Sequence, residues 1–229
     1  MKKLIAIALL LLVCTACTAQ PGGEAGTTTT AAETTTAPDT TAETTAKKEG
    51  AEGRSFQIAY PVLKNESCSV NALLQKAATE YPALYFDIPR SADYPELQSV
   101  EIDYEVKLAD ERFISVVFCG LAMREMRPHD LFYAVTIDKK TEKPLEIEEA
   151  VNQNADFWRI VLTAAEAELD PLIYQAISRT VAEHGKIGVE FYFTETALGL
   201  SFPLVYALGY HAELELPFEK LAGLMKLEG

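Results

Sequence analysis

Apolar and charged residues alternate strictly over residues 100–108. Even-numbered positions from Val100 to Leu108 are apolar, and odd-numbered positions from Glu101 to Lys107 are charged. A period of two predicts a β-strand with one buried and one solvated face. Residues 109–111 then predict a hairpin turn, and the apolar run 113–119 predicts a strand buried on both faces.

The rest of the chain predicts strands and helices in separate blocks. Further strands are expected at 56–60, 131–137, 189–193, 198–202 and 212–216, and helices at 70–81, 147–151, 155–169, 171–184 and 217–225. Pro82 is expected to end the first helix, and Asn154 and Asp170 are expected to cap the third and fourth. Gly185 suits the end of the fourth helix. This order predicts an α+β fold, an antiparallel β-sheet packed with helices.

The N-terminus has the pattern of a bacterial export signal. Two lysines precede ten apolar residues, 4–13, which are too few to span a bilayer that needs about 20. Ala16 before Cys17 resembles a lipobox, so we expect a signal peptide over 1–16 and a lipid on Cys17. Cleavage without lipidation is the alternative. A doubly acylated anchor would hold the chain on the outer face of the cell membrane.

A threonine-rich segment separates this anchor from the folded part. Residues 17–53 lack aromatic residues and contain runs of threonine, a composition that predicts a disordered linker. Residues 54–229 are long enough for one domain, with sub-modules at about 54–151 and 152–229.

The mature chain is strongly acidic. The whole sequence has 20 basic and 34 acidic residues, and loss of Lys2 and Lys3 with the signal leaves a net charge of −16. Such a charge argues against nucleic acid as a ligand and favours a cationic partner. The alternative is that acidity serves solubility alone.

Motifs for catalysis or metal binding are absent from the sequence. His129, His184 and His211 are the only histidines and lie in no HExxH motif, and no GxSxG motif occurs. We therefore predict no catalytic residue, no metal and no cofactor. Cys68 and Cys119 could form a disulfide in an oxidising exterior, and free thiols are the alternative.

A loop between two late strands is the best candidate for ligand binding. It contains Tyr206, Gly209, Tyr210 and His211. Phe157, Trp158 and Tyr192 could extend an aromatic platform, although core packing is the stronger interpretation of Phe157 and Trp158. Carboxylate pairs such as Glu190 and Glu195 leave a hydrolase as a third option, although an acidic chain contains such pairs by chance.

Several segments resemble one known family. Tyr60-Pro61, Val70-Asn71, VEIDYEVKLADERFISVVFCG and HDLFYAVTIDKKTEKPLEIEEAV resemble the first half of the extracytoplasmic region of RsiV-type anti-sigma factors, and also the accessory domain of some peptidoglycan deacetylases. VEFYFTETALGLSFPLVYALGYHAELELPFEKLAGLM resembles the module that follows in RsiV-type proteins.

The resemblance implies an extracellular α+β domain that binds rather than catalyses. In RsiV-type proteins this region captures lysozyme, so the partner is expected to be lysozyme or another cationic wall-associated protein. The deacetylase relatives suggest peptidoglycan as the alternative ligand. The transmembrane helix and sigma-binding segment of the family have no counterpart, so sigma-factor release is not implied.

Three positions depart from the family pattern. Glu142 stands where a turn glycine is usual, Gly209 replaces a proline, and His211 replaces a small residue. The loop is therefore expected to differ in shape from the family's loop.

The anchor gives a direct test. Replacement of Cys17 by serine should release the protein from the membrane fraction into the culture fluid, because it removes the acylated side chain. Cys14→Ser is the matched control and should stay with the membrane. Equal membrane retention of both variants would contradict lipidation at Cys17.

Overall fold

The computed structural model describes residues 42–49, 55–64, 66–86, 97–124 and 127–227, which all lie in one compact unit spanning residues 37–229. The predicted signal peptide and Cys17 lie outside the described residues. Within these ranges, no helix has both the length and the apolar character needed to cross a membrane.

The first part of the unit is a six-stranded sheet in the order β1-β2-β3-β4-β5-β6. Its strands are β1 (Ala42–Glu49), β2 (Ser55–Val62), β3 (Leu97–Ala109), β4 (Phe113–Arg124), β5 (Arg127–Asp138) and β6 (Lys143–Pro144). Neighbours are antiparallel except β2 and β3. That pair is parallel because helix α1 (Cys68–Phe86) forms the crossover between the two strands.

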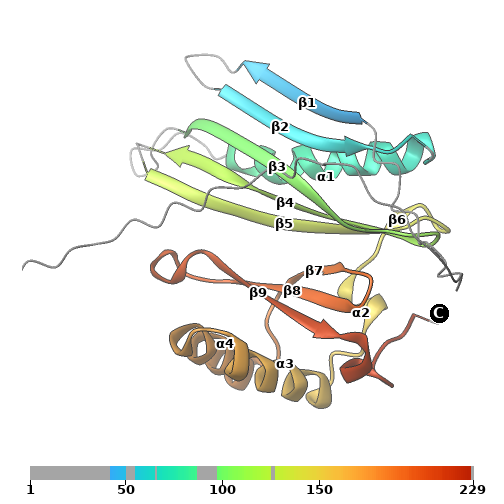
Figure 1. Ribbon diagram of the computed structural model, residues 1–229. Coiled ribbons are helices and arrows are strands. Elements are labelled where there is room, and N and C mark those ends of the chain that lie inside the picture. Colours follow the sequence, from blue (N-terminus) through green and yellow to red (C-terminus); the bar gives the residue numbers. More distant parts are fainter. Residues whose placement is uncertain (1–41, 50–54, 65, 87–96, 125–126, 228–229) are drawn as a thin grey trace, which may run out of the picture. The chain divides into compact units, whose positions relative to one another are not determined.

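The second part contains helices and a three-stranded antiparallel sheet, β7-β8-β9. Its elements are α2 (Ile147–Ala150), α3 (Ala155–Glu168), α4 (Pro171–His184), β7 (Glu190–Phe193), β8 (Ala197–Pro203) and β9 (His211–Pro217), with 3-10 turns η1 (Tyr206–Leu208) and η2 (Phe218–Leu221). Figure 1 shows this sheet between the larger sheet and the helices α3 and α4.

The structure confirms the predicted α+β class. The alternation in β3 is visible in its burial pattern. Two apolar residues, Val100 and Ile102, are buried, and three acidic residues of the opposite face, Glu101, Asp103 and Glu105, are exposed. Hydrophobic burial of one strand face thus orients β3 in the sheet.

Local capping follows the sequence closely. Asn154 accepts a hydrogen bond from the Phe157 amide, and Asp170 accepts one from the Leu172 amide. Gly185 ends α4 in the left-handed conformation with φ 74°. These caps fix where α3 begins and where α4 begins and ends, as predicted.

Four expectations need correction. The helix expected over 217–225 is only the short 3-10 turn η2 (Phe218–Leu221). Residues 42–49, assigned to the spacer, form β1 and pair with β2, because backbone hydrogen bonding at a sheet edge does not require large side chains. Helix α1 continues past Pro82 to Phe86, since the fixed φ of proline is compatible with a helix that loses one hydrogen bond. Cys119 is exposed, so the doubly buried stretch of β4 is residues 113–118.

The turn after β5 explains one departure from the family pattern. Asp138 accepts hydrogen bonds from the Lys140 and Thr141 amides, and Glu142 then has a left-handed φ of 53°. Glycine adopts this conformation without strain, which accounts for a glycine in related turns. Here the Glu142 carboxylate accepts a hydrogen bond of 2.8 Å from the Ser67 hydroxyl.

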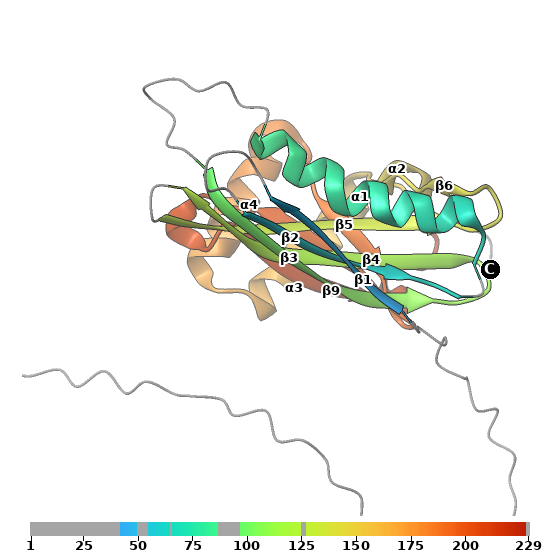
Figure 2. The same ribbon diagram turned by 90° about the horizontal axis from the view of Figure 1, so that it is seen from above.

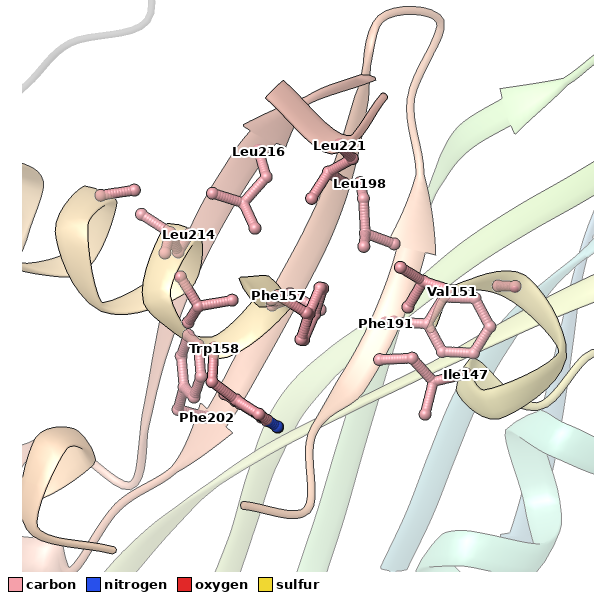
Figure 3. Packing of buried hydrophobic residues seen from close by; sticks show 14 of the residues in the cluster. Ile147, Val151, Phe157, Trp158, Phe191, Leu198, Phe202, Leu214, Leu216 and Leu221 are labelled. Carbon is pink, nitrogen blue, oxygen red and sulfur yellow. The ribbon is translucent and has the colours of Figure 1, made fainter. Parts of the chain in front are cut away.

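Two hydrophobic clusters stabilise the unit. One lies between α1 and the six-stranded sheet and includes Leu74, Phe118 and Tyr133; Figure 2 shows α1 running along this sheet. The other lies between β7-β8-β9 and the helices α2 and α3, with Phe157 and Leu214 fully or almost fully buried (Figure 3).

A buried hydroxyl group connects the two sheets through a hydrogen bond. Ser115 on β4 contacts the Thr136 hydroxyl of β5 at 2.8 Å and accepts a hydrogen bond of 3.0 Å from the Phe193 amide of β7. Ser115 and Thr136 are almost completely buried, so this bond satisfies an amide that water cannot reach.

Gly199 on β8 provides space for an aromatic ring on the side of the small sheet that faces the large one. A Cβ atom at Gly199 would lie 2.2 Å from the ring of Tyr192, whose side chain is 1% exposed.

Gly199→Ala should therefore destabilise the fold by about 1–3 kcal/mol, because it overpacks a rigid ring. Urea unfolding measures the change. Gly188→Ala is the control, since no atom lies within 4 Å of the added carbon there. Equal stabilities of the two variants would contradict the packing of Tyr192 on Gly199.

Candidate functional site

The β8–β9 loop has a closed backbone conformation. The Leu204 amide donates to the Tyr210 carbonyl at 2.6 Å, and the Leu208 amide donates to the Val205 carbonyl at 2.8 Å. Gly209 has φ 96° and Tyr210 has φ 65°. Proline, with φ near −65°, could not adopt the Gly209 conformation, so the loop differs in shape from one with proline there, as the sequence predicts.

Tyr210 fastens this loop to the larger sheet. Its hydroxyl donates to the Pro128 carbonyl at 3.3 Å and lies 3.0 Å from Nδ1 of His129, and the two rings lie 5.5 Å apart. A left-handed φ at a non-glycine residue costs about 1 kcal/mol or more, and these contacts at the start of β5 offset that cost. Tyr210 is thus partly buried and engaged within the molecule.

His211 forms a second contact between the sheets. Its ring stacks on Phe132 of β5 with centroids 4.5 Å apart, and its Nε2 lies 3.7 Å from a carboxylate oxygen of Glu213. His211, the first residue of β9, therefore packs against β5 next to the loop.

Tyr192 lies at the centre of a polar cluster between the sheets. Its hydroxyl donates to Glu213 at 2.9 Å and lies 3.4 Å from Glu215, and the Lys107 ammonium is 5.4 Å from the ring centroid. Burial and the two carboxylates raise the pKa of Tyr192 far above its ordinary value. The nearby His211 imidazole and the hydrogen bond from Tyr192 lower the pKa of Glu213.

Carboxylates of both sheets converge on Cys119. Although residue 119 as a whole is exposed, its thiol is partly screened from water, and this burial is the main cause that raises the pKa of the thiol. The carboxylates of Asp103 and Glu105 on β3 and of Glu213 on β9 raise it further. Three carboxylates from two strands that are distant in sequence thus lie close enough to act on one sulfur atom.

The suggested disulfide is not formed, since Cys119 has a free thiol. Residue 119 lies on the sheet face opposite the one covered by α1, the helix that begins at Cys68. The two positions are therefore on opposite sides of the sheet.

The other predicted residues are separated from this cluster. Phe157 and Trp158 are in the core, as preferred, while the burial of Tyr192 removes it from any open platform. Tyr206 begins η1, and its side chain lies outside the described structure. Glu190 and Glu195 flank opposite ends of β7, and Glu190 accepts a hydrogen bond of 3.2 Å from the Ala134 amide of β5.

Sequence reasoning missed Phe132 and Lys107 as members of the site. Phe132 lies between Asp130 and Ala134 on one face of β5. A large aromatic residue between an acidic one and a small one could have indicated a contact. Within the described ranges, no group of three or more His, Cys, Asp or Glu side chains is arranged to hold a metal ion.

Comparison with known proteins supports the fold. No family model matches the chain, and no curated protein matches it. A DUF3298 family protein from Pseudomonas aeruginosa PAO1 has a similar structure, with TM-score 0.57 and 14% identity over 81% of this chain and 93% of that one. A DUF3298 family member from Bacteroides fragilis NCTC 9343 has TM-score 0.50 and 11% identity, over 80% of this chain and 92% of that one.

At these identities the likeness shows the shared fold alone.

Glu213 gives the cluster a testable pH dependence. Because the folded state lowers its pKa from 4.5, Glu213 adds stability above the pKa it has when unfolded, and this contribution is lost as the pH falls through the folded pKa. In Glu213→Gln, the free energy of unfolding should therefore decrease less steeply than in the wild type as the pH falls from about 5 to 3. Urea unfolding across this range measures the effect, and parallel curves for wild type and variant would contradict the hydrogen-bonded carboxylate.

Proposed function

We propose that this protein is a lipid-anchored, non-enzymatic binding domain on the outer face of a bacterial membrane. Its ligand is a cationic wall-associated protein, with lysozyme as the first candidate. The observation that supports this proposal best is the convergence of carboxylates from β3 and β9 beside a fastened loop.

The charge distribution favours a cationic partner. Asp103, Glu105 and Glu215 are exposed, and Lys107, the cation among them, is already paired with Glu105 at 2.7 Å. The surrounding chain is also acidic, so the field attracts positive charge over several ångströms and raises the rate of encounter.

Burial of the aromatic residues weakens the glycan-binding alternative. Sugar recognition by stacking needs open rings, but Phe157, Trp158 and Tyr192 are buried and Tyr210 is engaged with β5. A hydrolase would need two carboxylates about 5–10 Å apart with divergent pKa values. Glu190 and Glu195 flank opposite ends of β7, an arrangement that does not favour a hydrolase site.

The direct test is binding of residues 18–229 to lysozyme at low and high salt. Contacts between exposed charges should weaken by about tenfold or more between roughly 50 and 500 mM salt. The double variant Asp103→Lys, Glu105→Lys should bind at least about tenfold more weakly at low salt. Glu166→Lys, Glu168→Lys makes the same change of charge on α3 and is the control.

Equal losses in both double variants would show that net charge alone governs binding. Salt-insensitive retention on purified peptidoglycan, without binding to lysozyme, would contradict the proposal and favour the glycan-binding module.

A further inference from the structure

Strand β1 is attached to the large sheet along one side only. All eight of its residues, Ala42–Glu49, pair with β2, and β1 is the outermost strand of the order β1-β2-β3-β4-β5-β6 (Figure 1). Its sequence, AETTAKKE, contains two alanines as its only apolar residues. Burial of apolar side chains is the main favourable contribution to folding, so β1 is held chiefly by backbone hydrogen bonds.

Strand β2 is held independently of β1. Ile58 and Tyr60 are 7% and 6% exposed and belong to the cluster between α1 and the sheet. The amide and the carbonyl of Leu63, just after β2, bond the Asn71 side chain of α1 at 2.8 and 3.0 Å. The first half of β2, Ser55–Ile58, also pairs with β3. β1 can therefore leave the sheet while β2 stays in place, and water then bonds the freed edge of β2.

The register puts the open end of the β1–β2 hairpin where the spacer enters. Ala42 lies opposite Val62, and Glu49 lies opposite Ser55 at the connected end. A pull on the chain before residue 42 therefore loads the Ala42–Val62 pair first. The pairs of β1 then break one after another, because the load acts at each moment on the outermost pair alone. Pairs that break singly need less force than pairs that must break together.

We propose that β1 is a releasable strap in the tether, which unzips from β2 under tension between the membrane anchor and a bound partner. Residues 18–41 span at most about 85 Å when fully extended, and release of residues 42–54 adds about 45 Å. The acidic strands β3 and β9 do not pair with β1, so the binding face keeps its structure while its reach from the membrane grows. This inference rests on the lipid anchor of the proposed function and is independent of the identity of the ligand.

Optical tweezers that pull residues 18–229 by the two ends test the strap directly. An early event should release about 45 Å of chain at a force below that of global unfolding, and it should reverse when the force is lowered. A trace in which the whole domain unfolds in one step, without this event, would overturn the strap.

A disulfide across the open end of the hairpin is the matched control. Directly opposite residues of an antiparallel pair lie about 4.5–5.5 Å apart at Cα, a distance that a disulfide spans. Ala42→Cys with Val62→Cys, made together with Cys68→Ser and Cys119→Ser, should lose the 45 Å event when oxidised and recover it when reduced. An event of the same size in the oxidised protein would assign it to another element and would overturn the proposal.

Amide hydrogen exchange tests the strap without force. The amides of β1 that bond to β2 should exchange at least about 100-fold faster than the paired amides of β4, and oxidation of the disulfide should slow them. Equal exchange of β1 and β4 in the reduced protein would overturn the strap and leave the proposed function standing. Failure of the anchor itself appears separately, as equal membrane retention of Cys17→Ser and Cys14→Ser.

Discussion

The hydrogen bond from the Phe193 amide to the Ser115 hydroxyl fixes the small sheet against the large one. It is buried, so breaking it would leave an amide without water or protein to accept its proton, which is costly in a protein interior. This contact sets where β7 crosses β4, and it therefore sets where Tyr192 meets Lys107 and where β9 approaches β5. Every residue of the candidate site depends on that crossing.

The crossing also explains the polar character of the space between the sheets. One face of each sheet is used by its own helices, α1 for the larger and α3 for the smaller. The remaining faces carry Lys107, Cys119, Glu213 and Glu215, which require either water or partners. Gly199 leaves space for the Tyr192 ring on this face. The Tyr192 hydroxyl can then donate a hydrogen bond to the Glu213 carboxylate of β9. The acidic surface is thus a consequence of how two half-buried sheets meet.

Much of the fold could be predicted because its signals are local. The alternation in β3, the caps Asn154 and Asp170, and Gly185 each depend on neighbours within a few residues. The strand at 42–49 could not be predicted, because its pairing with β2 comes from backbone geometry and its composition is that of a linker. The loop at 206–211 was found, but the role of Tyr210 was not, since His129 is 81 residues distant along the chain.

The central claim is that a partner binds where the acidic face and the β8–β9 loop meet. Chemical-shift mapping of isotope-labelled residues 18–229 with lysozyme tests it most directly. The account predicts changes at the amides of residues 204–213 and at the outward positions of β3, with α3 and α4 unaffected. Changes confined to α3 and α4, or no changes at any lysozyme concentration, would contradict it.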